Sequence, residues 1–317
     1  ATQPSWFYVM VVVTVLLLTE LKHTFTEFAQ RMKNDEMITL AKFLAISGII
    51  LPMLPHKNLI PDINLTPYSI WLATVVVSGI SYLSYLLKRY VFHESGTLVS
   101  GIIGGLYSST ATISVLARKS RKASELEATD YVAAMLLAVS MMFLRFMILI
   151  LIFSREIFLS IYPYLLTMAV VAAIVAWFIH SRQKRPEDQP AETEEDDSSN
   201  PLEFKVALIF AVLFVIFTFL THYTLVYAGT GGLNLLSFVS GFSDITPFIL
   251  NLLQNTGSVA ALIITACSMQ AIISNIMVNM FYALFFAGKG SKLRPWILGG
   301  FGVVITCNLV LLLFFYI

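Results

Sequence analysis

Hydroxyl side chains and one carboxylate interrupt two otherwise apolar stretches of this chain, residues 97–117 and 233–254. The polar side chains are Ser108, Ser109, Thr110 and Thr112 in the first stretch and Ser243, Asp244 and Thr246 in the second. Carboxylate oxygens are ligands for metal cations, and hydroxyl groups hydrogen-bond polar solutes. The pattern therefore predicts one shared site that binds a small ion or polar solute, with Asp244 the best candidate for a metal ligand.

Two charged side chains, Arg145 and Asp244, stand deep inside apolar segments. A charge at the centre of a bilayer costs at least about 2.5–3.5 kcal/mol, so each should be paired or face a polar cavity. Asp244 would bind a cation or a proton, and Arg145 would be its charge partner or a ligand for an anionic group. A purely structural ion pair between them is the alternative.

Asparagine side chains make a further polar group in the segment from 259 to 287, where Asn275 and Asn279 share a broad helical face with Gln270 and Ser274. We expect Asn275 and Asn279 to lie near the shared site. Polar contacts that only join helices are the alternative interpretation of this face.

The composition indicates the elements that must position these residues. The chain has 317 residues, of which 57% are hydrophobic and only 12% charged, whereas a soluble domain has roughly a quarter charged residues. Ten apolar segments can be marked, most of them near the 20 residues or so that span a bilayer. The fold class is predicted to be all-α and polytopic, with eight spanning helices and two re-entrant helical hairpins, 97–117 and 233–254.

Each hairpin is expected to reach mid-membrane, because an arm of about ten residues extends roughly 15 Å, half the hydrocarbon thickness. Non-helical backbone at that depth is tolerated only where it is buried or lines a polar cavity, so the two tips should meet there. Thr246 is a predicted N-cap with Pro247 at the first helical position, and Ser109 or Thr110 is the matching cap in the first hairpin.

Lys and Arg residues favour this topology. With both stretches re-entrant and the N-terminus outside, nearly all loop Lys and Arg fall on the cytoplasmic side, and only Lys57 and Arg155 fall outside. If both stretches crossed the membrane, the two sides would carry equal numbers. The hairpins then enter from opposite faces, which predicts an inverted-topology repeat of the kind found in secondary transporters.

The repeat can be aligned by its residues. Gly105 aligned on Gly241 places Ser108 on Asp244 and Thr110 on Thr246. In the following helices, Ser140 aligns with Ser274 and Arg145 with Asn279, at a slightly different offset.

Four regions follow from the same pattern. Residues 1–36 form an N-terminal helix and cytoplasmic connector, and residues 37–180 form the first membrane half. Residues 181–203, rich in Glu, Asp, Pro and Ser, form a disordered cytoplasmic linker, and residues 204–317 form the second half. Both termini are expected outside.

The run from Gly104 to Thr112, followed by the basic residues from Arg118 onward, resembles bacterial membrane proteins of the MgtC/SapB family. More narrowly, the chain from about Glu36 to its C-terminus is similar to the C-terminal domain of unknown function 4010, which follows an MgtC domain. The resemblance implies a bacterial inner-membrane protein linked to magnesium homeostasis, whose first helix is the end of an MgtC domain. Asn279 departs from the basic residue that family members usually carry there.

Two functions remain open at this point. The first is a transporter or channel for a small ion or polar solute, and the second is a non-transporting regulatory membrane protein of MgtC type. We expect no enzymatic activity, no cofactor and no nucleic-acid partner, since no His, Cys and carboxylate cluster has metal or nucleophile spacing. The expected partners are the lipid bilayer, the transported solute, and a second copy or another membrane protein.

Overall fold

The computed structural model describes residues 11–16, 19–20, 22, 34–60, 63–92, 96–121, 125–182, 204–254, 259–288 and 291–316. The chain divides into two units, Ala1–Ile50 and Leu51–Ile317. Most of the predicted N-terminal region 1–36 and, in the predicted linker, residues 183–203 lie outside the described residues.

In the first unit, α2 (Asn34–Ala45) continues into a wider π-helical turn, η1 (Ile46–Ile50). Ser47 donates its hydroxyl to the carbonyl oxygen of Phe43 at 2.6 Å, which satisfies the side chain inside the helix. Many apolar side chains of this helix are exposed in the chain, as expected of a surface that faces lipid.

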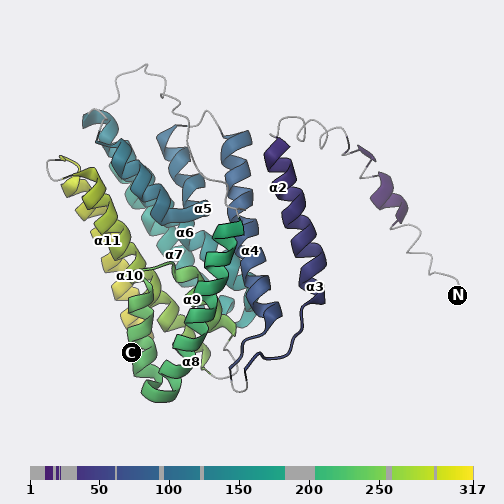
Figure 1. Ribbon diagram of the computed structural model, residues 1–317. Helices are drawn as coiled ribbons and strands as arrows, with labels where there is room; N and C mark the ends of the chain where they lie inside the picture. Colours follow the sequence, from purple (N-terminus) through teal and green to yellow (C-terminus); the bar gives the residue numbers. More distant parts are fainter. Residues whose placement is uncertain are drawn as a thin grey trace, which may run out of the picture. The chain divides into compact units, whose positions relative to one another are not determined.

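The second unit is a set of helices that run side by side, labelled in Figure 1. They are α3 (Leu51–Met53), α4 (Pro67–Leu86), η2 (Leu87–Val91), α5 (Thr97–Lys119), α6 (Glu125–Phe153), α7 (Arg155–Ser181), α8 (Phe204–Ser240), α9 (Ile245–Gln254), α10 (Ala261–Ala287) and α11 (Arg294–Tyr316). Ile60 and Ile63 form an isolated bridge, and the described residues contain no longer strand. The prediction of an all-α protein is confirmed.

Eight helices among the described residues are long and apolar enough to cross a membrane. Seven of them overlap predicted spanning segments, although Val206–Ser240 also runs into the predicted hairpin 233–254. The eighth is α5, where a re-entrant hairpin is predicted. The chain is therefore a multi-pass membrane protein in a lipid bilayer.

Local sequence explains where the helices begin. Thr66 caps α4 by accepting a hydrogen bond from the backbone N–H of Ser69 at 2.9 Å, and the hydroxyl of Ser69 accepts one from the Thr66 N–H at 3.1 Å. Pro67 stands at the first helical position, where its missing N–H costs nothing. Ser154 caps α7 in the same way, through the Ile157 N–H at 3.4 Å.

The core lies where α6 packs between α5 and α7, and where α10 packs against α5, α8 and α11. Two polar contacts tie these helices together: Ser140 donates to the carbonyl of Ala169 at 2.8 Å, and Tyr164 donates to the carbonyl of Asn308 at 2.9 Å. The outer surface is apolar, as the 68% exposure of Trp177 illustrates.

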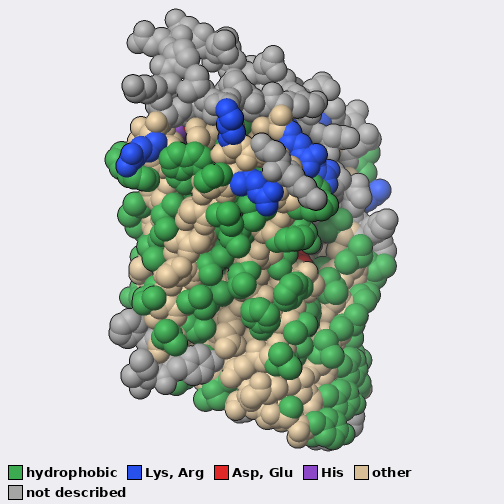
Figure 2. Space-filling view, turned by 90° about the vertical axis from the view of Figure 1, so that its left-hand side faces the viewer, with side chains coloured by type: hydrophobic (Ala, Val, Ile, Leu, Met, Phe, Trp, Pro, Cys, Tyr) green, Lys and Arg blue, Asp and Glu red, His purple; other side chains and the backbone are tan. Residues whose placement is uncertain are grey.

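Lys and Arg side chains gather at one end of this unit, called the cationic end here (Figure 2). At this end the last turn of α5 meets the last turn of α10: Arg118 lies over the Phe286 ring at 4.3 Å, and Arg121 donates to the carbonyl of Phe285 at 3.2 Å. At the opposite end, the loop before α4 meets the end of α9, because Asn64 donates to the carbonyl of Gln254 at 2.7 Å.

Candidate functional site

The helix α5 folds back on itself at Ser108, whose backbone is extended rather than helical, with φ −159° and ψ 106°. A Cβ added to Gly104 would lie 2.5 Å from Oγ1 of Thr112 and 3.3 Å from its Cβ. In a straight helix these two residues would be roughly 12 Å apart, at 1.5 Å per residue. The two halves, residues 97–107 and 109–119, therefore pack side by side, and the predicted site residue Thr112 is used in that contact.

The base of this fold-back lies at the cationic end. Lys88, which precedes α5, and Lys119, in its last turn, lie within electrostatic range of each other. Ser108 stands at the turn, where its hydroxyl accepts a hydrogen bond from the Ala111 N–H at 3.4 Å. The cap is thus Ser108, one or two residues before the predicted Ser109 or Thr110.

The second stretch contains two changes of direction. At Gly229 the backbone has φ 58° and ψ −152°, and α8 turns back there, at the bottom of Figure 1. A Cβ on Gly232 would lie 2.8 Å from Cγ2 of Thr224, which only a folded chain allows. The helical residues 230–240 then end, and α9 starts at Ile245.

Asp244 caps α9, because its Oδ1 accepts a hydrogen bond from the Thr246 N–H at 2.9 Å. The prediction that Thr246 is the cap and Pro247 the first helical residue is therefore wrong by two positions. A carboxylate is at least as good a cap as a threonine hydroxyl, and it also complements the positive end of the helix dipole. With Ser108 and Asp244 as caps, the two aligned positions have the same role.

Both tips press a glycine against a neighbouring helix. A Cβ on Gly105 would lie 2.5 Å from Cα of Ala138 in α6, and a Cβ on Gly241 would lie 2.3 Å from Cβ of Ser274 in α10. Ala138, rather than the predicted Ser140, is thus the counterpart of Ser274. Ser140 points away, to α7.

Arg145 joins the two tips. From α6 it donates through Nη1 to the carbonyl oxygen of Tyr107 at 2.7 Å and through Nη2 to Oγ1 of Thr246 at 3.1 Å. The Tyr107 carbonyl ends the first half of α5, where the break at Ser108 interrupts the helix, and Arg145 donates to it there. Asp244 attracts the guanidinium electrostatically, although Nη1 and Nη2 of Arg145 both donate to neutral oxygens.

The polar face of α10 satisfies the other tip. Ser274 donates to the carbonyl of Phe238 at 2.7 Å, and Asn275 donates through Nδ2 to the carbonyl of Gly241 at 3.2 Å. Asn279 donates to Oδ1 of Asn275 at 3.2 Å, and its own Oδ1 is buried with no hydrogen-bond partner among the described residues. These side chains stand where the first arm of the second stretch ends.

Exposure differs between the tips. Phe242, Ser243 and Asp244 are exposed, whereas Ser109 is buried. Ser243 donates to the carbonyl of Ser240 at 3.1 Å, and the carbonyl of Thr110 accepts from Ser114 at 2.8 Å. A ligand at the tips would therefore reach the second tip first.

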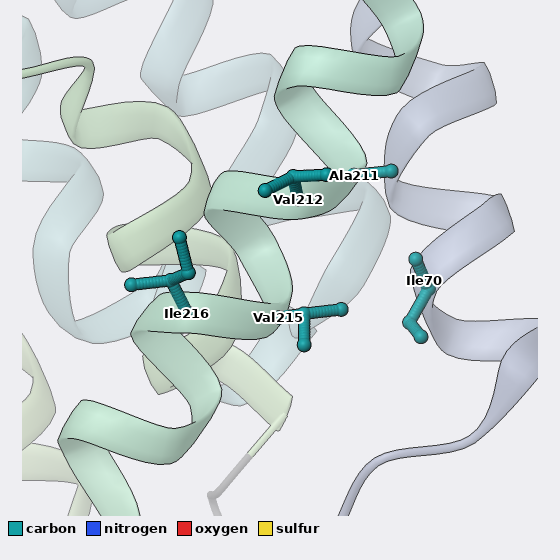
Figure 3. Close-up of a pocket in the computed structure, with 5 residues that line it drawn as sticks. All are labelled: Ile70, Ala211, Val212, Val215 and Ile216. Atoms are coloured by element: carbon teal, nitrogen blue, oxygen red, sulfur yellow. The ribbon is translucent and has the colours of Figure 1, made fainter.

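Metal ligands do not gather at the tips in the part of the chain that the structure describes, and the cavity described below lies elsewhere. Within the described ranges, no three His, Cys, Asp or Glu side chains stand close enough to hold a metal ion together. A cavity of about 260 Å³ lies between α4 and α8 rather than at the tips (Figure 3). Its lining is aliphatic throughout, from Ile70, Ala211, Val212, Val215 and Ile216. This groove suits a hydrocarbon chain and offers nothing to an ion.

Two contributors to the site are absent from the sequence-based expectations. Tyr107 contributes through its backbone carbonyl, which no side-chain pattern signals. Gly229 starts the arm that carries the second tip. The sequence could have predicted this turn, because the run Gly229, Thr230, Gly231 and Gly232 has a composition typical of turns.

Comparison with known proteins adds a family to this geometry. The family model described as "Domain of unknown function (DUF4010)" matches residues 75–287, which contain both tips and Arg145. This chain belongs to that family. A relative from Aquifex aeolicus, an uncharacterized protein, is 25% identical over 227 residues, which are 70% of this chain and 96% of the relative. No solved structure matches the chain. The family is the narrower part of the resemblance drawn from the sequence, and its MgtC/SapB part stays a prediction.

Proposed function

We propose that the protein is a transporter or channel for a small ion or polar solute, and not an enzyme. The ligand would bind between the tips at Ser108 and Asp244. One observation supports this most strongly: Arg145 joins the carbonyl of Tyr107 to the hydroxyl of Thr246, so two broken helices share one polar centre. Broken backbone at membrane depth is stable only where protein or a polar cavity surrounds it.

We infer that α5 and residues 230–254 are two re-entrant hairpins in an inverted repeat. The base of the first is near Lys88, after the end of α4, and the base of the second is near Asn64, before its start. Since α4 has 20 residues and is about 30 Å long, the two bases stand at opposite membrane faces. α9 has 10 residues and reaches about 15 Å, which supports a tip at mid-depth.

The proposed mechanism uses the second halves of the hairpins. Backbone N–H groups at their starts, next to Ser108 and Asp244, give each a positive dipole end that faces the centre. Arg145 contacts both hairpins, so a rocking of one against the other changes its contacts and opens the centre to one side at a time. This is alternating access around a fixed site. A channel would instead keep both sides open.

The cationic end would face the cytoplasm, since Lys and Arg concentrate there in membrane proteins. In a bacterial inner membrane this orientation places both termini outside and residues 181–203 in the cytoplasm. A second copy of the chain is a further expected partner.

Flux into proteoliposomes tests the proposal. Purified protein would be reconstituted and screened with monovalent and divalent cations, inorganic anions and small polar solutes. Asp244→Asn should reduce the flux of the accepted solute at least about tenfold, because the cap keeps one hydrogen bond while the charge is lost. Glu156→Gln, an exposed carboxyl in the first turn of α7, is the matched control and should leave flux unchanged.

No flux of any solute above protein-free liposomes would overturn the transport proposal. A regulatory role of the MgtC type, linked to magnesium homeostasis, would then explain the fold better. Equal flux in Asp244→Asn and in the unmodified protein would remove Asp244 from the site.

A further inference from the structure

Thr246 holds the two opposite charges of the tips apart. Its backbone N–H donates to Oδ1 of Asp244 at 2.9 Å, while its hydroxyl oxygen accepts from Nη2 of Arg145 at 3.1 Å. The same residue thus contacts the carboxylate on one side and the guanidinium on the other. Within the part of the chain that the structure describes, Arg145 and Asp244 attract each other through space without a direct ion pair.

This arrangement is a costly one for a purely structural role. Each charge pays to enter the membrane, and a direct, hydrogen-bonded ion pair is the usual way to offset that cost. Here both groups can form more hydrogen bonds than the contacts above use. A guanidinium has five N–H donors, and the hydrogen bonds of Arg145 above use two of them. The Asp244 carboxylate uses Oδ1 for the cap and is exposed.

We propose that the ligand of this centre is a small zwitterion with one carboxylate and one ammonium group, such as an α-amino acid with an uncharged side chain. The proposal rests on the transport function proposed above and names its substrate class. The ligand carboxylate would face Arg145, which is suited to bidentate carboxylate recognition. The ligand ammonium would face the free oxygen of Asp244.

Charge balance favours this class over a single ion. The centre itself holds one positive side chain, Arg145, and one negative side chain, Asp244, so its net charge is zero. A bound cation or anion would give the loaded centre a net charge in a medium of low dielectric constant, which is expensive. A zwitterion satisfies both side chains and leaves the loaded centre neutral, so loaded and empty forms can reorient at similar cost.

Neighbouring side chains offer further contacts to such a ligand. Ser243 and Asp244 are exposed and accessible, and Phe242, 63% exposed, offers an apolar surface beside them for an aliphatic side chain. At the other tip, Ser108 contributes a hydroxyl beside the N-terminal end of residues 109–119. That positive end adds to Arg145 as a place for a carboxylate.

A binding screen with matched analogues tests the ligand class. The full chain in detergent would be screened by thermal stabilisation and equilibrium binding against α-amino acids with uncharged side chains. The best binder would then be compared with the amine that lacks its carboxylate and the acid that lacks its ammonium. For L-alanine these analogues are ethylamine and propionate. We expect the zwitterion to bind at least about 100-fold more tightly than either analogue, because each analogue leaves one charged side chain unpaired.

Two variants assign the charges separately. Asp244→Asn should remove the preference for the zwitterion over the acid while the preference over the amine remains. Arg145→Gln should remove the preference for the zwitterion over the amine while the preference over the acid remains. If Arg145→Gln fails to fold, Asp244→Asn alone carries the test.

Proteoliposome flux separates this inference from the proposed function. Transport of an inorganic ion, with no zwitterion bound or transported, would overturn the ligand class and leave the transport function standing. Absence of flux for ions and zwitterions alike would overturn the transport function itself. Equal affinity of the unmodified protein for zwitterion and single-charge analogue would also overturn the ligand class.

Discussion

A disulfide between positions 104 and 112 tests the fold-back of α5 directly. A Cβ added to Gly104 would lie 3.3 Å from the Cβ of Thr112, close to the roughly 3.5–4.5 Å of a disulfide. A straight helix would place the residues roughly 12 Å apart, far beyond the reach of any disulfide. The two geometries therefore predict opposite results, and no small shift of the chain converts one geometry into the other.

The experiment uses Gly104→Cys with Thr112→Cys, in a chain that carries Cys267→Ala and Cys307→Ala. After mild oxidation in membranes, the pair should be protected from maleimide and should lose the mass of two hydrogens. Gly299→Cys, in a chain with Cys267→Ala and the native Cys307, is the matched control. This pair has the same spacing on α11, a continuous helix, and should stay reduced. Oxidation of the 104–112 pair no faster than the control would refute the fold-back.

Three further predictions concern the tips and the arm that carries them. Gly241→Ala should destabilise the protein by about 1–3 kcal/mol, because the added Cβ would lie 2.3 Å from the Ser274 side chain. Ser274→Gly in the same chain should recover part of this loss. Thermal unfolding in detergent measures both effects. Gly229→Ala should cost about 1–3 kcal/mol from backbone strain alone, as nothing lies within 4 Å of the added Cβ; a cost near zero would mean that the turn is placed elsewhere. A double-mutant cycle of Arg145→Met and Thr246→Val should give a coupling energy of about 0.6–1.7 kcal/mol by denaturant unfolding, and additive effects would contradict their hydrogen bond.

Sequence patterns predicted the location of the tips better than their chemistry. Gly105 and Gly241 were aligned from the sequence, and both press against the next helix in the structure. The cap positions were missed by one or two residues, because a hydroxyl or carboxylate at several neighbouring positions satisfies the same capping preference. Which one caps depends on where the preceding helix ends.

The role of Arg145 was open from the sequence alone. A buried arginine can pair with a carboxylate, bind an anion or hold backbone carbonyls, and composition does not separate these. The structure adds Tyr107 and Thr246 as its acceptors, which lie on α5 and α9. Asn275 and Asn279 were expected near the site from the sequence. In the structure Asn275 donates to the backbone of the second tip, and Asn279 donates to Asn275.

The sequence by itself determined that this chain is helical and lies in a membrane, because hydrophobic length and charge content are properties of each segment alone. It also marked the points where two helices break, since glycine and hydroxyl residues interrupt the apolar runs there. Only the tertiary structure decided that residues 97–119 fold back instead of running straight, and that Arg145 reaches both breaks. Those outcomes depend on contacts between segments far apart in the chain, such as Gly105 with Ala138 and Arg145 with Thr246.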